Sequence, residues 1–188
     1  PGAYDISLRT LQDLIHHQFD MTRFGELTFD HGLVTPLHFI RPNFDIPVLP
    51  VIINCGAKPL PSLSRCYELG RTIGESLRNN PDAGRIVVIG SGGISHHVGT
   101  EKMKEIDEEF DRMFLDDILN NRIDKVLKYD PDRISAAGNG AEEVRNWVAM
   151  AGALGEYTGE LLCYEPSPEW ITGIGMCSFK PAHSAAAV

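Results

Sequence analysis

The stretch Ile86–His97 (IVVIGSGGISHH) carries the residue types best suited to chemistry in this sequence. A β-branched run leads into Gly90–Gly93, which contains three glycines, and Ser95 and His96 follow at once. In α/β proteins ligands collect beyond the carboxyl ends of strands, and glycine lets the backbone approach them closely. Histidine can accept and return a proton near neutral pH. His96 is therefore a candidate acid–base residue, with an incidental histidine in a tight turn as the alternative.

A phosphate-binding loop is a second interpretation of Gly90–Gly93. Both of the common glycine spacings for such loops, GxGxxG and GxxxxGK[ST], are absent. A nucleotide- or phosphate-binding α/β domain nevertheless stays open as an alternative at this point.

Two further motifs supply candidate residues. Asp30-His31-Gly32 has turn-forming neighbours around a histidine, and such a histidine is either solvated or functional. Glu142 and Glu143 open a helix whose apolar stripe includes Trp147. At about 100° per residue, Glu142 points to solvent and Glu143 lies at the border of the stripe, where a metal ligand could sit. We interpret the other histidines as structural or solvated: His16, His17, His38, His97 and His183.

Hydrophobic periodicity predicts the helices that must position these groups. The sequence favours helices over Asp5–His17, Gly32–Ile40, Pro61–Asn79 with Ser62 as N-cap, Thr100–Asn120 and Ala141–Leu154.

Strands are expected between and after these helices. The predicted strands are Phe24–Phe29, Pro47–Asn54, Arg85–Ile89, Glu160–Tyr164 and Gly173–Phe179. Two of them, Pro47–Asn54 and Arg85–Ile89, are continuous β-branched runs of the kind buried on both faces. Alternating strands and helices predict an α/β layered fold, with a central mostly buried sheet flanked by helices and residues 1–188 in a single domain.

Composition narrows the functional classes. The 188 residues are 43% hydrophobic and 23% charged, as in an ordinary soluble domain. A formal charge of −9 and a pI near 5.2 argue against nucleic-acid or anionic-membrane partners. No apolar run is long enough to span a bilayer, and the N-terminus does not read as a signal peptide. The four widely spaced cysteines favour a reduced, cytoplasmic protein.

Five motifs in order carry a family resemblance. FDHG, PVLPVIIN, KPLPSLSR, GSGGISH and YEPSPEWITGIG together resemble class III extradiol dioxygenases over about Leu8 to Phe179. The likeness is closest to the branch that cleaves dihydroxyphenylpropionate, and more distant to the protocatechuate-cleaving branch.

The resemblance implies roles for individual residues. His31 and His96 match the acid–base histidines of the family, and Glu143 matches the carboxylate of its 2-His-1-carboxylate Fe(II) site. It further implies that a catechol-type substrate and O2 meet at Fe(II), that one histidine removes a phenolic proton and that the other donates a proton during ring opening. We favour His31 as base and His96 as acid, with Ser95 and Trp170 shaping the substrate pocket. A homo-oligomer is also expected.

Two departures from the family pattern qualify these roles. The two iron-binding histidines of the family precede the region that matches Pro1, and neither His16 nor His17 matches them. Because the chain also starts without methionine, we expect an N-terminally incomplete fragment. The short passage from His97 to Glu101 lacks a longer insertion of the propionate-cleaving branch. The alternative function is a non-catalytic homologue that acts as a partner subunit or small-molecule-binding protein.

Overall fold

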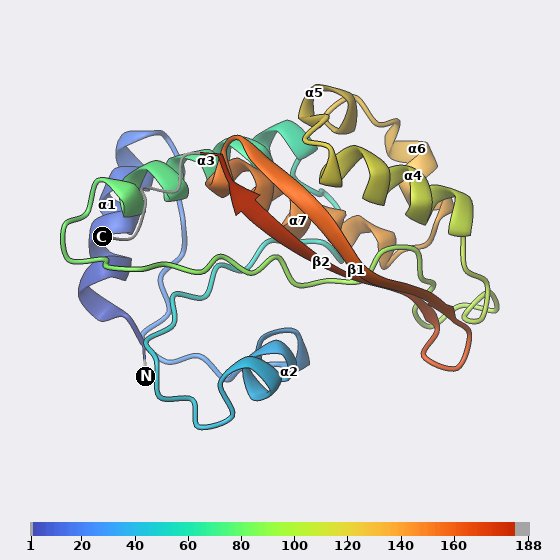
Figure 1. Ribbon diagram of the computed structural model, residues 1–188, viewed down its shortest axis with the longest axis horizontal. Helices are drawn as coiled ribbons and strands as arrows, with labels where there is room; N and C mark the ends of the chain where they lie inside the picture. The colour runs from blue at the N-terminus through green and yellow to red at the C-terminus, as the bar shows by residue number, and fades with distance from the viewer. Residues whose placement is uncertain (1, 183–188) are drawn as a thin grey trace.

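The computed structural model, which describes residues 2–182, centres on two helices in close contact, α3 (Leu63–Arg78) and α7 (Val144–Leu154) (Figure 1). The contact is close because glycines of α3 face the backbone of α7. A Cβ atom on Gly70 would lie 1.8 Å from a backbone oxygen of α7, and one on Gly74 would lie 2.2 Å from another. The missing side chains thus let the two helix backbones nearly touch.

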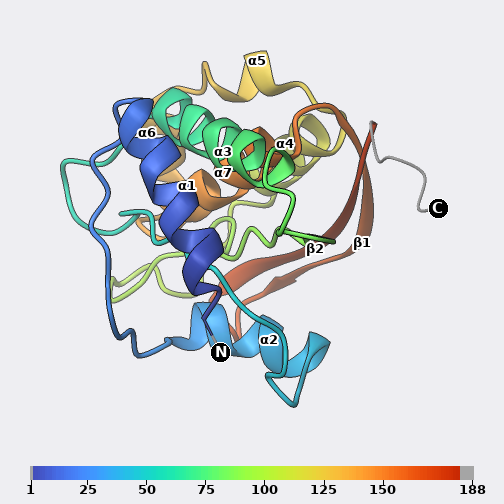
Figure 2. The same ribbon diagram turned by 90° about the vertical axis from the view of Figure 1, so that its left-hand side faces the viewer.

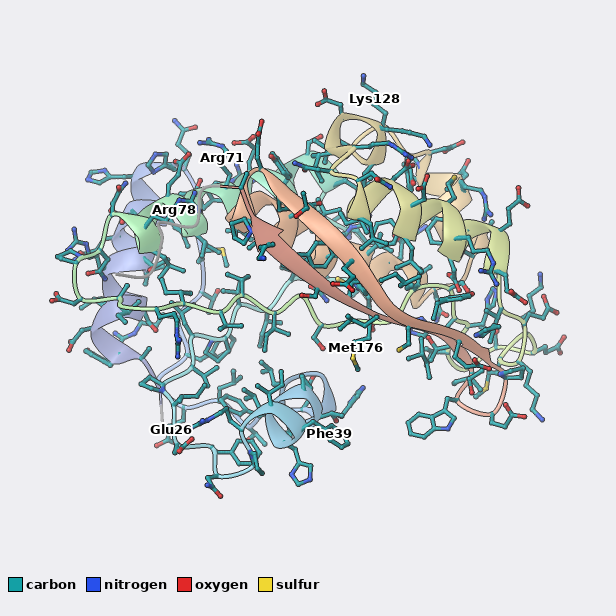
Figure 3. All side chains as sticks on the ribbon, viewed as in Figure 1. Glu26, Phe39, Arg71, Arg78, Lys128 and Met176 are labelled. Carbon is teal, nitrogen blue, oxygen red and sulfur yellow. The ribbon has the colours of Figure 1, made fainter. Side chains whose placement is uncertain are left out.

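The remaining helices surround this pair. They are α1 (Tyr4–His16), α2 (His31–Ile40), α4 (Glu108–Leu119), α5 (Ile123–Val126), α6 (Pro131–Ala136) and the single 3₁₀ turn η1 (Ala141–Glu143). Figure 2 shows α1 lying along α3, where Leu14, Phe19, Leu69 and Ile73 form a small apolar cluster. The main core lies where α4 and α7 meet, and its fully buried members include Phe110, Phe114, Val144 and Val148.

A long hairpin crosses the helices. β1 (Tyr157–Ser167) pairs antiparallel with β2 (Thr172–Pro181), with an irregularity between Leu161 and Cys163. The hairpin is tied to α4, because the hydroxyl of Tyr157 donates to the Ile118 carbonyl oxygen at 2.7 Å. With its helices and this antiparallel sheet the structure confirms the α/β class.

The predicted helices are confirmed, with one late start. Ser62 caps α3 as expected, since its hydroxyl accepts from the Arg65 amide at 3.1 Å. The helix predicted from Thr100 begins only at Glu108, because the Asp107 carboxylate accepts from the Phe110 amide and caps the helix there. Residues 100–106 form turns and extended chain instead.

The strand predictions are confirmed for the C-terminal pair and wrong for three segments. Glu160–Tyr164 and Gly173–Phe179 lie within β1 and β2. Phe24–Phe29, Pro47–Asn54 and Arg85–Ile89 belong to no strand, apart from a single bridge between Gly2 and Val48.

The physical reason for this difference is pairing. A β-branched run becomes a strand only when a neighbouring segment takes up its backbone hydrogen bonds. Within residues 2–182 the segment Arg85–Ile89 has no such neighbour, and its Val87 side chain is 77% exposed rather than buried. Periodicity identified the apolar runs but not their partners.

Further expectations concern the termini, membranes and cysteines. His183, which we interpreted as structural, lies outside the described residues. Within residues 2–182 no helix is long and apolar enough to cross a membrane. All four cysteines have free thiols, and Cys66 is buried in the core.

Candidate functional site

His96 occupies a tightly enclosed position where three segments meet. Its backbone forms an isolated antiparallel bridge with Thr172 at the start of β2. Its carbonyl oxygen accepts from the Gly140 amide at 3.1 Å. A Cβ atom on Gly140 would lie 2.0 Å from the imidazole Nε2, so only glycine leaves room for the ring there. The functional role predicted for His96 stays a prediction, and the geometry shows that its ring is tightly enclosed.

One hydrogen bond defines the protonation pattern of the His96 ring. Nδ1 lies 3.1 Å from the carbonyl oxygen of Ile94. A carbonyl oxygen can only accept, so Nδ1 carries the proton and the neutral ring presents a lone pair at Nε2. In the neutral ring, Nε2 is therefore a proton acceptor.

The Glu143 carboxylate lies close to Nε2 of His96. Glu143 is the last residue of the 3₁₀ turn η1 and directly precedes α7, and its side chain is 37% exposed. Its Oε1 lies 3.9 Å from Nε2 of His96, while its Oε2 accepts from the Gly93 amide at 2.7 Å. Glu143 lies in the 3₁₀ turn, so the α-helical phase used for it does not apply, and its role as a metal ligand stays a prediction.

Two side chains of α7 hold the glycine-rich loop beside Glu143. The side-chain amide of Asn146 donates to the Ser91 carbonyl oxygen at 2.8 Å, and the indole N–H of Trp147 donates to the Gly92 carbonyl oxygen at 3.0 Å. Gly92 has φ +148°, and a Cβ atom there would lie 2.9 Å from Cβ of Glu143. Sequence reasoning missed Asn146, although its place three residues after Glu143 puts it on the same helix face.

The prediction that Glu142 points to solvent is wrong. Glu142 is buried, where it pairs with Arg145 and accepts from the Ser135 hydroxyl at 2.9 Å. The helical phase does not apply to it, because residues 141–143 form a 3₁₀ turn rather than an α-helix. Glu142 therefore belongs to the packing of this turn and not to the site.

His31 lies on a neighbouring segment rather than against His96. It is the first residue of α2, whose N-cap Asp30 accepts from the Leu33 amide at 3.3 Å. The hydroxyl of Ser91 donates to the Gly32 carbonyl oxygen at 2.7 Å and so ties the start of α2 to the glycine-rich loop. The His31 side chain is exposed and makes no hydrogen bond to His96 or Glu143 within residues 2–182. The structure thus brings His96 and Glu143 together. His31 is linked to them only through the hydrogen bond between Ser91 and the neighbouring Gly32.

The two residues expected to shape a pocket differ in position. Ser95 is fully buried, and its hydroxyl and amide both contact Asp111, so it lies behind His96 rather than facing a ligand. Trp170 is 74% exposed in the turn between β1 and β2, two residues before Thr172, the bridge partner of His96. Ser95 is thus bound to Asp111 in the interior, whereas the exposed Trp170 side chain is accessible to a ligand.

The remaining described histidines have no part in this arrangement. His16, His17 and His38 are exposed, and His97 is half-buried beside the site. Their positions agree with the structural or solvated interpretation.

Cys55 is a site neighbour that the sequence did not indicate. Its thiol lies 3.9 Å from Oδ1 of Asn146. Burial raises the pKa of this thiol to about 11, so it remains protonated at neutral pH. A protonated thiol is a poor nucleophile and a poor metal ligand. Cys55 therefore lies beside Asn146 as a protonated thiol.

The donor atoms of the described chain do not by themselves make a metal site. Across residues 2–182 no three His, Cys, Asp or Glu side chains cluster as metal ligands would. Glu143 offers one oxygen, because the other is engaged by the Gly93 amide. A 2-His-1-carboxylate iron site needs three protein ligands, so this part of the chain does not fit Fe(II) alone.

The geometry also argues against the phosphate-loop interpretation of Gly90–Gly93. Phosphate loops run directly into the N-terminus of a helix, whereas the next helix here begins at Glu108. The Gly93 amide is already used by the Glu143 carboxylate, whose charge would repel an anion.

Comparison with known proteins then assigns the fold to a family. The profile described as "Catalytic LigB subunit of aromatic ring-opening dioxygenase" matches residues 1–175. The chain belongs to the LigB family. The recognised likeness to class III extradiol dioxygenases is thereby confirmed, and the α/β fold is the one that this family shares.

Curated relatives agree with this membership. A 2,3-dihydroxyphenylpropionate/2,3-dihydroxicinnamic acid 1,2-dioxygenase of Photorhabdus laumondii is 28% identical over 96% of this chain and 73% of its own length. The protein of the same name from Paraburkholderia xenovorans is 28% identical over 94% of this chain and 71% of its own. A gallate dioxygenase of Pseudomonas putida is 27% identical over 81% of this chain and 46% of its own.

The alignments also bear on chain length. The match to the Photorhabdus protein extends over 232 positions, more than the 188 residues of this chain. The relative therefore carries residues within the aligned region that this LigB chain lacks.

Proposed function

We propose that this chain carries the His96 and Glu143 part of an extradiol dioxygenase, which opens a catechol-type ring with O2 at a non-haem Fe(II). Membership of the LigB family and the dioxygenase names of the relatives support this reaction class. The observation that carries the proposal is the 3.9 Å approach of His96 Nε2 and Glu143 Oε1 beside the glycine-rich loop. An acid–base histidine next to a candidate metal carboxylate is the arrangement that such chemistry requires.

His96 is suited to accept the first proton. Its Nδ1 is committed to the Ile94 carbonyl oxygen, so Nε2 is free to take a proton from a ring hydroxyl. The neighbouring Glu143 carboxylate would stabilise the imidazolium that results. This geometry supports His96 as base and leaves His31 as the donor, the reverse of the order that the sequence alone favoured.

Glu143 would contribute one iron ligand through Oε1. The described residues do not hold Fe(II) alone, so the proposal requires two further ligands from polypeptide other than residues 2–182. Within residues 2–182 the apolar segments Pro47–Asn54 and Arg85–Ile89 belong to no strand and have few backbone hydrogen bonds, which makes them suited to receive additional strands.

The substrate class follows from the reaction. Extradiol cleavage needs two adjacent ring hydroxyls, and the names of two relatives specify 2,3-dihydroxy aromatic acids. Trp170 offers an exposed aromatic face beside the His96 bridge, where it could contact the ring or its substituent.

The test uses the full protein in which this chain occurs, loaded with Fe(II) under anaerobic conditions. O2 uptake and visible absorbance are followed with catechol, protocatechuate, gallate and 2,3-dihydroxyphenylpropionate. The proposal predicts a coloured ring-opened product from at least one of these, formed in equal amount to the O2 consumed.

The second candidate is a non-catalytic homologue that binds small molecules or a partner subunit. It is favoured by the single metal-ligating carboxylate of the described chain. If an iron-loaded sample binds the catechols, as shown by calorimetry, but consumes no O2, the enzyme proposal is overturned in favour of this candidate.

A further inference from the structure

A buried carboxylate lies directly behind the candidate site. Asp111 of α4 is 0% exposed and accepts three hydrogen bonds. Its Oδ1 accepts from the Ser95 amide at 2.7 Å, and its Oδ2 accepts from the Ser95 hydroxyl at 2.9 Å and the Tyr164 hydroxyl at 2.8 Å. Two of its three partners thus belong to the residue before His96.

Every polar group of Ser95 forms a hydrogen bond. Its hydroxyl accepts from the Asp107 amide at 3.0 Å in addition to donating to Asp111. Its carbonyl oxygen accepts from the Gly173 amide at 2.9 Å. Because the amide, hydroxyl and carbonyl are all engaged, the peptide groups on both sides of Ser95 have fixed orientations.

These two peptide groups determine how the His96 ring is held. The first is the Ile94–Ser95 peptide group. Its carbonyl oxygen accepts from Nδ1 of the His96 ring, and its N–H donates to Asp111. Asp111 therefore binds one end of the peptide group whose other end binds the imidazole. The other peptide group leads directly into the His96 backbone.

The surroundings of Asp111 are adapted to keep it in place. A Cβ atom on Gly173 would lie 1.9 Å from its Oδ2, so only glycine fits beside the carboxylate. Burial raises the pKa of the Asp111 carboxyl, and the hydrogen bonds from Tyr164 and Ser95 oppose that rise. Burying a carboxylate is costly unless hydrogen bonds compensate it. An asparagine at position 111 could also accept a hydrogen bond from the Ser95 backbone amide, so this bond does not by itself require a carboxylate.

We propose that Asp111 is a positioning residue for His96, acting through Ser95. It fixes the Ile94–Ser95 peptide group so that the Ile94 carbonyl oxygen holds the proton on Nδ1 and Nε2 faces Glu143 as an acceptor. The importance of this device for catalysis rests on the proposed function, whereas its effect on the His96 ring does not.

The same helix offers a matched control. Asp117 is also 0% exposed on α4, and it accepts from the Tyr129 hydroxyl at 2.7 Å while pairing with Lys125 and Arg122. None of its partners touches Ser95 or His96 in the hydrogen bonds of residues 2–182. Loss of either carboxylate should lower stability, but only loss of Asp111 should alter the His96 ring.

The experiment compares Asp111→Ala, Asp111→Asn and Asp117→Ala by ¹⁵N NMR of histidine-labelled protein. The chain has seven histidines, and a His96→Gln sample assigns the His96 signals. In the unaltered protein the neutral ring is expected to show the Nδ1-protonated tautomer. Asp111→Ala should convert this to a mixture of both tautomers, Asp111→Asn should largely restore it, and Asp117→Ala should leave it unchanged.

Two patterns overturn the inference: an unchanged His96 tautomer in Asp111→Ala, or an equal change in both alanine variants. If Asp111→Ala does not fold, Ser95→Ala provides the test, because it removes only the hydroxyl bonds to Asp111 and Asp107. It should shift the tautomer in the same direction by a smaller amount, and no shift would refute the proposal.

Activity measurements separate this inference from the proposed function. In the iron-loaded protein, Asp111→Ala should lower kcat by up to about 100-fold, because a small misplacement of a reacting group has effects of that order. A shifted tautomer with unchanged ring cleavage would support positioning by Asp111 and show that this positioning does not limit the reaction.

Discussion

Glu143 and His96 come from segments far apart in the chain, yet Oε1 and Nε2 lie 3.9 Å apart. The approach depends on two glycines. Gly93 donates its amide to the other Glu143 oxygen, and Gly140 leaves space for the imidazole ring. At this distance the carboxylate can bind a cation while the neutral imidazole accepts a proton. Variants of Glu143 and His96 separate these two roles.

Glu143→Gln should lower the iron content of the full protein by more than about tenfold, because a neutral amide is a much weaker ligand for iron than a carboxylate. Metal analysis of purified protein measures this directly. Glu142→Gln is the matched control, since the neighbouring residue is buried with Arg145 and does not face the site. Full iron occupancy in Glu143→Gln would rule out Glu143 as a ligand.

His96→Ala should retain iron and lose ring cleavage by about 10²- to 10⁴-fold, the usual contribution of a general acid–base group. Steady-state O2 uptake on an iron-loaded sample measures the loss. His97→Ala, at the adjacent half-buried residue, should keep most of the activity. Unchanged turnover in His96→Ala would show that its Nε2 takes no part in the reaction.

Glu142→Ala should destabilise the protein by about 3–5 kcal/mol, because it leaves the buried Arg145 without its carboxylate partner. Urea unfolding followed by circular dichroism gives the free energy. The control is Glu68→Ala, which removes an exposed partner of Arg71 and should cost about 1 kcal/mol or less. Equal losses in the two variants would contradict the burial of the Glu142–Arg145 pair.

Gly74→Ala should destabilise by about 1–3 kcal/mol through overpacking, although alanine is normally favoured over glycine inside a helix. The added Cβ would lie 2.2 Å from a backbone oxygen of α7 and push α3 away from it. Gly25→Ala serves as control, since nothing lies within 4 Å of a Cβ atom there. Thermal unfolding measures both, and a stabilised Gly74→Ala protein would disprove the close helix contact.

Asp107→Asn tests a pH dependence. The hydrogen-bonded Arg133 guanidinium holds the pKa of the Asp107 carboxyl below its ordinary value of 3.8. A lowered folded-state pKa gives stability that is complete above 3.8 and is lost as pH falls through the folded value. Asparagine can keep the cap of α4 through its amide oxygen, while it removes the charge and one of the two oxygens that accept from Arg133.

The Asp107→Asn protein should therefore be less stable than its parent by about 1–2 kcal/mol at neutral pH. The difference should shrink as the pH is lowered below 3.8 towards the folded pKa. Urea unfolding of both proteins across this range measures it. A difference that is constant with pH would show that the Arg133 ion pair contributes nothing.

Local sequence patterns determined the helices and the main site candidates of this LigB chain. The apolar spacing of α1, α3 and α7 and the Ser62 cap act within one or two turns, so they can be read without the rest of the fold. The glycine-rich stretch before His96 indicated a close approach of the backbone for the same local reason, and Gly92 and Gly93 are indeed crowded by neighbouring atoms.

Tertiary structure decided the rest, because it depends on partners that lie far away in the sequence. The runs Pro47–Asn54 and Arg85–Ile89 have strand character, yet whether they pair depends on a neighbour that periodicity does not reveal. The burial of Glu142 follows from a 3₁₀ turn and from Arg145. The hydrogen bonds from Ser95 to Asp111 cross from one segment to another, so only the folded chain shows that a carboxylate lies behind His96.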